Sequence, residues 1–222
     1  MRQPLLLPNI ISEPEFRVVR TPRERILRFA TIMGFIGMLR PHALKQLSPR
    51  SFTMVTAKGQ RIKMPAQPHL FEMELTRLRG HNHILGFYIQ FHSKTMRCAR
   101  AYFPSLCIMD VHLRVSQMCP VRALVDLSRR RLLPEAFLRK MNTKMTLTKY
   151  LQRLTGLERN IAPYALRIGG RTWLLAKGLD RQFVDFLGTW KSPEASARYF
   201  RAAPREVILM LRRFYFTQSR TL

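Results

Sequence analysis

Apolar residues recur at helical spacing over most of this chain, and the first helix has a clear start signal. Thr21 is placed to cap a helix, Pro22 suits its first turn, and Glu24 completes a capping box. The apolar positions that follow form the buried side of a helix that ends near Gly37. A second short helix is expected over residues 40–47.

The pattern changes from helical to mixed and then to strand-like before the middle of the chain. Residues 53–56 predict a strand, and residues 70–78 fit either a strand or a short helix. Residues 84–91 and 97–103 are rich in apolar and aromatic residues. They flank a turn that contains Lys94, so we expect a β-hairpin with this lysine at its tip.

Beyond Pro120 the helical period persists. The expected helices cover residues 121–131, 134–141, 147–154, 163–177, 181–187, 193–200 and 204–216. The sequence therefore predicts an α+β fold, mainly α, with one small antiparallel sheet. Residues 1–20 contain prolines without a clear period and predict an extended arm. Residues 21–203 are expected to form one domain, and residues 204–222 a C-terminal helix or tail.

The most unusual feature of the composition is its large positive net charge. The 222 residues include 39 Lys and Arg against 13 Asp and Glu, a formal charge of +26. This excess predicts a polyanionic partner, because each phosphate that a cation neutralises releases condensed counterions. Nucleic acid is the first choice and an anionic membrane the second. The longest apolar run, residues 29–39, is far shorter than the roughly 20 residues that span a bilayer, so no membrane partner is expected.

The cysteines and histidines bear on the redox compartment of the protein and on metal binding. Three cysteines at irregular spacing, without a Cys-x-x-Cys pair, predict a reduced intracellular protein. His81, His83 and His92 are not completed by cysteines or carboxylates at ligand spacing. We therefore expect no metal site.

Three side chains in the second half are of the types that phosphodiester chemistry needs. Arg167 lies in YALRIGG (residues 164–170), Trp190 lies in LGTWKS (residues 187–192), and Tyr199 follows. A guanidinium fork binds phosphate oxygens, an indole N–H donates to them, and a tyrosine oxygen can attack phosphorus. Each residue alone is normally packing or a solvated charge, so the prediction depends on the set.

In order and spacing, these residues resemble the active site of the tyrosine recombinase (phage integrase) family. The resemblance runs from about residue 21 to residue 200 and implies a helical catalytic domain with a small antiparallel sheet. The motifs look especially similar to recombinases of eukaryotic mobile elements of the Crypton or DIRS type. In this family Arg167 would hold the scissile phosphate, Trp190 would donate its N–H to it, and Tyr199 would attack it.

Further positions extend the resemblance and two depart from it. Arg40, in GFIGMLRP, resembles the first catalytic arginine, which holds a non-bridging oxygen. Lys94 resembles the lysine that protonates the leaving 5′ oxygen. Ala43 stands where the family often has an acidic residue, and Tyr164 stands where it has histidine. A tyrosine hydroxyl still bonds a phosphate oxygen, but its pKa near 10 makes it a poorer base at neutral pH.

The resemblance implies an enzyme that cleaves and rejoins DNA through a 3′-phosphotyrosine, in site-specific recombination or DNA integration. It implies no metal or cofactor, double-stranded DNA as the partner, and a homotetramer on that DNA. The location would be the nucleus if the source is eukaryotic. Two alternatives stay open: a catalytically impaired DNA-binding descendant of a recombinase, and a single-duplex topoisomerase.

Overall fold

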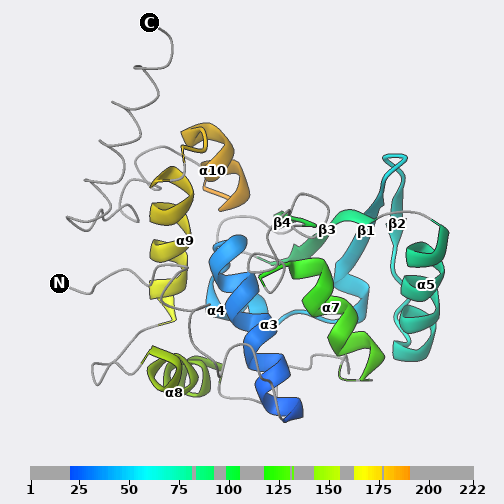
Figure 1. Cartoon of the computed structure of the whole chain (residues 1–222), viewed down its shortest axis with the longest axis horizontal. Helices are drawn as coiled ribbons and strands as arrows, with labels where there is room; N and C mark the ends of the chain where they lie inside the picture. Colours follow the sequence, from blue (N-terminus) through cyan, green and yellow to red (C-terminus); the bar gives the residue numbers. More distant parts are fainter. Residues whose placement is uncertain are drawn as a thin grey trace, which may run out of the picture.

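The computed structural model describes residues 21–81, 84–92, 99–105, 118–130, 132, 143–155, 163–176 and 178–190. Its helices are α3 (Pro22–Ile36), α4 (Pro41–Leu44), α5 (Pro68–His81), α7 (Pro120–Arg129), α8 (Thr143–Thr155), α9 (Tyr164–Ala176) and α10 (Arg181–Leu187), with a 3-10 turn at Pro49–Ser51. Its strands are β1 (Phe52–Thr56), β2 (Arg61–Lys63), β3 (Ile84–Phe91) and β4 (Ala99–Pro104). The described fold is therefore mostly helical with one small antiparallel sheet, as predicted (Figure 1). The expected arm, hairpin turn, helices 134–141 and 193–200, and tail lie outside the described residues.

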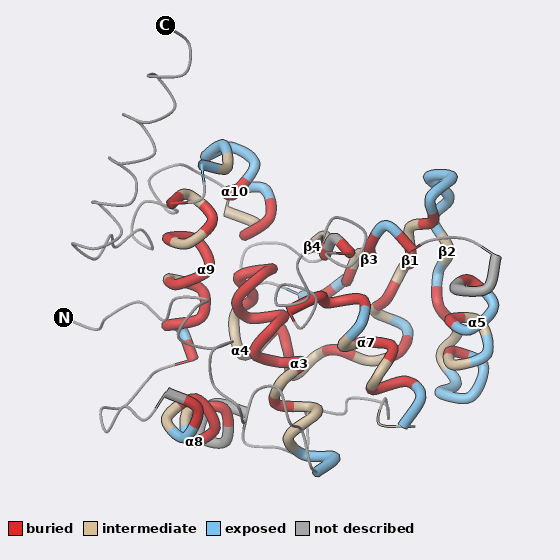
Figure 2. The backbone as a smooth tube through the Cα atoms, in the orientation of Figure 1, coloured by how far each residue is buried: buried red, intermediate tan, exposed pale blue. Residues whose placement is uncertain are grey.

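Helix α3 begins and ends where the sequence predicts. The Thr21 hydroxyl accepts a hydrogen bond from the Glu24 backbone N–H at 3.2 Å, and the Thr21 N–H donates to the Glu24 carboxylate at 3.1 Å. This is the predicted capping box, and Gly37 ends the helix. Every residue from 29 to 36 is buried (Figure 2). The second half of α3 is therefore buried on all sides, which places it inside the core, whereas its first turns are partly exposed.

The sheet has strand order β2-β1-β3-β4 and is antiparallel throughout. The predicted pairing of β3 with β4 is confirmed: Phe87 lies opposite Phe103, and Tyr88 lies opposite Tyr102. Successive side chains of a strand point to opposite faces. Phe87 and Phe103 therefore share the inner face, where their rings stack with centroids 5.2 Å apart, and the two tyrosines share the outer face.

Residues 70–78, for which the sequence fitted a strand or a short helix, lie within helix α5 (Pro68–His81). Phe71, Leu75 and Leu78 are buried at helical spacing. The ring of Phe71 meets the edge of Phe52 in β1, with centroids 5.8 Å apart. This contact with the sheet decides in favour of the helix, because a short apolar run alone is compatible with either structure.

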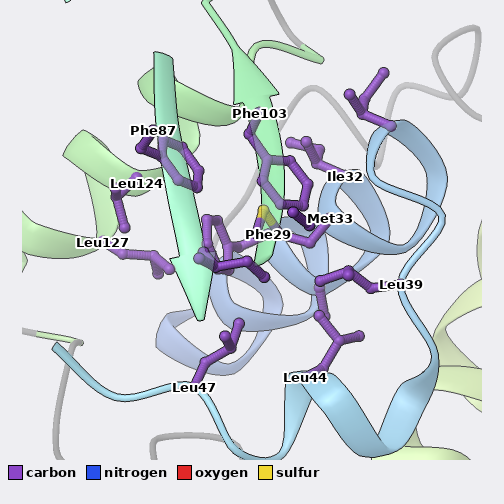
Figure 3. Close-up of a cluster of buried hydrophobic side chains, with 14 of the residues drawn as sticks. Phe29, Ile32, Met33, Leu39, Leu44, Leu47, Phe87, Phe103, Leu124 and Leu127 are labelled. Carbon is purple, nitrogen blue, oxygen red and sulfur yellow. The ribbon is translucent and has the colours of Figure 1, made fainter. Parts of the chain in front are cut away.

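The inner face of the sheet packs against α3 and α7 to form the main core (Figure 3). Phe29 and Met33 of α3 and Leu124 of α7 belong to this core, as do Phe87 and Phe103 of the sheet. Gly37 is required at the end of α3, because a Cβ there would overlap the ring of Phe103. The end of α3 is thereby fixed against strand β4.

A second, smaller apolar cluster joins the end of α3 to the last described helices. Met38 packs there with Leu174 of α9 and with Val184 and Leu187 of α10. The half-buried Trp190 packs against this cluster. Among the described helices, none is long and apolar enough to cross a membrane.

Candidate active site

Helix α9, which carries the most specific motif, lies at close range on the end of α3. A Cβ added to Gly170 would overlap the carbonyl oxygen of Phe35, and one added to Gly34 would lie 2.9 Å from Leu166 Cδ1. Small residues at both positions allow the two helices to approach. Gly170 therefore serves the close packing of α9 on α3. This contact between α9 and α3 places Arg167 beside the residues that follow α3.

Arg167 is buried, with 3% of its surface exposed, and its guanidinium joins two separate segments. One terminal nitrogen donates to the carbonyl oxygen of Met38. The other donates to the carbonyl oxygen of Gly188 at 3.0 Å. Met38 is two residues before Arg40, and Gly188 is two residues before Trp190. The structure therefore brings together the Arg167, Arg40 and Trp190 segments, which are distant in sequence.

Both segments that meet Arg167 contain a left-handed residue other than glycine. Met38 has φ 49° and Thr189 has φ 54°. This conformation is unfavourable for side-chain-bearing residues, and most of all for β-branched ones such as threonine. The left-handed turns direct the Met38 and Gly188 carbonyls to the same guanidinium. Strain of this kind persists only where surrounding contacts enforce it, and the two hydrogen bonds supply such contacts.

Trp190 folds back over the end of α10. Its backbone N–H donates to the carbonyl of Asp185 at 3.0 Å. Its ring covers Gly188 so closely that a Cβ there would overlap the ring. The Arg167 guanidinium carbon lies 4.0 Å from the ring centroid, which is cation–π geometry. Trp190 as a whole is half-buried, and its indole nitrogen is buried.

Two further residues of this cluster, Arg171 and Asp185, were not predicted from the sequence. Arg171 is 2% exposed, and its Nε lies 3.4 Å from the Asp185 carboxylate. Its guanidinium carbon lies 5.7 Å from the Trp190 ring centroid. Burial lowers the pKa of Arg171, and the Asp185 carboxylate acts in the opposite direction. The spacing of four residues from Arg167, which places both arginines on one face of α9, was the available signal.

Arg40 precedes α4 in extended backbone and is half-buried. Its carbonyl accepts a hydrogen bond from the Ala43 N–H at 2.9 Å. Ala43, which stands where the recombinase family often has an acidic residue, is fully buried in the main core. A carboxylate at this position would be desolvated among apolar side chains, so the small apolar side chain of alanine suits it.

Tyr164 begins α9, one turn before Arg167, and is 42% exposed. It lies on the same helix as the arginines but nearer to solvent. Lys94 and Tyr199 lie outside the described residues. At the end of β3, the N–H of His92 donates to the Gln46 side chain at 2.7 Å. This bond holds the end of the strand beside the chain that follows α4 and Arg40.

The described cluster is a cationic site with an aromatic surface. The buried guanidinium groups of Arg167 and Arg171 lie near the Trp190 ring, and the carboxylate of Asp185 neutralises one charge. Guanidinium and indole N–H groups are hydrogen-bond donors that suit phosphate oxygens. In the described segments, no three His, Cys, Asp or Glu side chains come together as metal ligands.

Compared with models of known protein families and with curated protein sequences, the chain gives no match.

Proposed function

We propose that this protein cleaves and rejoins double-stranded DNA through a 3′-phosphotyrosine intermediate, as a tyrosine recombinase does. The observation that carries the proposal is the position of Arg167. From a single helix it bonds the segment of Arg40 and the segment of Trp190, and its guanidinium lies against the indole. The backbone segments that carry three motifs of the resemblance thus meet at one arginine, and this supports a common phosphate site.

Each residue has a defined role in this reaction. The Tyr199 oxygen attacks phosphorus as its proton passes to solvent, the bond to the 5′ oxygen breaks, and Lys94 gives that oxygen a proton that it regains from solvent. Arg40, Arg167 and Trp190 stabilise the charge on the non-bridging oxygens, and Tyr164 assists as a hydroxyl donor.

The product is a protein–DNA phosphodiester, so the energy of the broken DNA phosphodiester is retained in the bond to tyrosine. Attack of a 5′ hydroxyl on the phosphotyrosine reverses the step and rejoins a strand. Exchange between two duplexes would require a tetramer, with DNA integration or site-specific recombination as the result. A eukaryotic source would place the reaction in the nucleus.

The net charge of +26 supports DNA as the partner. Neutralisation of several phosphates makes the binding constant fall steeply with salt concentration. Binding of this kind does not select a sequence, because phosphate contacts position a protein and base contacts specify its site.

A second function, DNA binding without cleavage, is favoured by a specific observation. Arg167 is almost fully buried, and its two terminal nitrogens donate to main-chain carbonyls. An arginine in this position stabilises the fold whether or not it also contacts a phosphate. Tyr164, which stands where the recombinase family has histidine, also favours DNA binding without cleavage. A recombinase descendant that kept the fold and lost the chemistry would retain these features.

Covalent trapping separates the two functions. The protein is incubated with a pool of nicked duplexes that release a short 5′ fragment on cleavage, and adducts that resist SDS are measured. Tyr199→Phe removes the proposed nucleophile, and Tyr215→Phe is the matched control at a tyrosine outside the motif spacing.

An adduct that is lost in Tyr199→Phe and kept in Tyr215→Phe supports cleavage. Salt-dependent duplex binding without any adduct supports the non-cleaving descendant. Absence of salt-dependent binding to duplex DNA contradicts both functions.

A further inference from the structure

The outer face of the sheet, away from the core, carries a row of polar and aromatic residues across all four strands. Lys63 of β2 lies opposite Thr53 of β1, which lies opposite Tyr88 of β3, which lies opposite Tyr102 of β4. We call this surface the outer sheet face, and it also includes Arg61, Gln90 and Arg100.

Two tyrosines form an aromatic surface at the middle of the outer sheet face. The rings of Tyr88 and Tyr102 have centroids 5.0 Å apart and are tilted by 49°. The Tyr102 hydroxyl donates to the carbonyl of Leu85 at 3.2 Å. A Cβ on Gly86 would lie 2.6 Å from that hydroxyl oxygen, so glycine allows the tyrosine to lie across the strand. The position of Tyr102 is therefore fixed by the sheet rather than left to solvent.

Positive charge surrounds these rings. The guanidinium carbon of Arg61 lies 5.1 Å from the centroid of Tyr88. Arg61, Lys63 and Arg100 are exposed, and Lys58 in the turn between β1 and β2 is exposed as well. Among the described outward-facing residues of the four strands, none is acidic. A surface of this charge repels cations and attracts phosphates.

We propose that the outer sheet face binds unpaired nucleotides, with bases stacked on Tyr88 and Tyr102 and phosphates near the surrounding cations. Aromatic rings beside cations on a sheet are the means by which proteins hold single strands, because every base has a face that stacks. In a duplex these faces are covered by neighbouring base pairs, so the rings have nothing to stack on. The guanidinium of Arg61 is itself a plane on which a base can stack. This activity goes beyond strand cleavage and requires neither Arg167 nor Tyr199.

Binding of labelled oligonucleotides tests the proposal. The probe is an oligothymidine of about 12 nucleotides, within the site sizes of known single-strand binding domains. A strand of abasic sites with the same number of phosphates is compared with it, because this strand offers charge without bases. An oligouridine of equal length shows whether the natural strand is DNA or RNA, and a duplex of equal length completes the set.

Paired substitutions isolate the aromatic rings. Tyr88→Leu with Tyr102→Leu removes both stacking surfaces, and Tyr88→Phe with Tyr102→Phe keeps them. The leucine protein should lose at least about tenfold in affinity for oligothymidine or oligouridine, since the loss of stacking costs about fivefold or more for each of the two rings removed. Its affinity for the abasic strand should not change, and the phenylalanine protein should keep most of its affinity for the base-bearing strands.

Removal of an arginine away from the outer sheet face controls for the general loss of positive charge. Arg61→Ala should weaken binding of the base-bearing strands more than Arg129→Ala, because α7 packs on the inner face of the sheet. If the leucine protein does not fold, ultraviolet crosslinking of an iodouridine strand to the native protein replaces it, and the crosslink should map to Tyr88 or Tyr102.

Equal affinity of the native protein for the oligothymidine and the abasic strand would overturn the proposal, because phosphate contacts alone would then explain binding. Unchanged affinity in the folded leucine protein, or crosslinks confined to other residues, would also overturn it. Tyr199→Phe should bind oligothymidine as the native protein does. Failure of this proposal is therefore distinguishable from failure of the proposed cleavage reaction.

Discussion

Replacement of Arg167 by methionine tests the arrangement of the candidate site most directly. Methionine has a similar length, but it carries neither charge nor donor. The change leaves the carbonyls of Met38 and Gly188 without this donor. It also removes the guanidinium from the ring of Trp190. The substitution should therefore destabilise the fold.

The magnitude follows from these contacts. A buried carbonyl that loses its donor costs about 1–3 kcal/mol, and the cation–π contact contributes about 0.5–2 kcal/mol. The loss of a buried charge offsets part of this sum, because the guanidinium no longer has to be desolvated. We expect the free energy of unfolding to fall by about 2–4 kcal/mol, which corresponds to a decrease in Tm of about 5–15 °C for a chain of this size.

Urea and thermal unfolding followed by circular dichroism measure the effect. Arg129→Met, at an exposed arginine of α7, is the matched control and should change stability by less than about 0.5 kcal/mol. Arg167→Lys keeps the charge but cannot donate to two carbonyls in fork geometry, so it should also destabilise. A loss in Arg167→Met no larger than in the control would refute the bridging role of Arg167.

Two further predictions concern helix packing and pH. Gly170→Ala should destabilise the protein by about 1–3 kcal/mol, because the new Cβ overlaps the carbonyl of Phe35 and forces α9 away from α3; an unchanged unfolding midpoint would contradict this. Burial, with a smaller contribution from Tyr88, raises the pKa of Tyr102 above its ordinary value. Its contribution to stability should be complete below pH 10, the ordinary pKa of tyrosine, and should be lost as pH rises through the higher pKa of the folded protein. Absorbance titration of tyrosinate in the native protein and in Tyr102→Phe measures this pKa, and ionisation of Tyr102 at or below pH 10 would disprove the assignment.

Local sequence signals predicted those elements whose bounds depend on neighbouring residues. The capping box of Thr21 and Glu24 and the stop at Gly37 involve groups within a few residues of each other, so the sequence contains all that determines them. The pairing of β3 with β4 followed from two strand-like runs separated by a short turn. The sequence did not distinguish a helix from a strand at α5, because its short apolar run is compatible with both. The packing of Phe71 on Phe52 of the sheet decides between them.

For the candidate site, the sequence by itself determined which residue types lie along the chain and in what order. It named Arg40, Arg167 and Trp190 through their resemblance to a recombinase, and it overlooked Arg171 and Asp185. Only the tertiary structure decided that Arg167 is buried and joins two distant carbonyls. Burial and such bonds depend on how α9 packs against the end of α3 and on the left-handed turns at Met38 and Thr189. These are contacts between segments far apart in sequence, which no local pattern specifies.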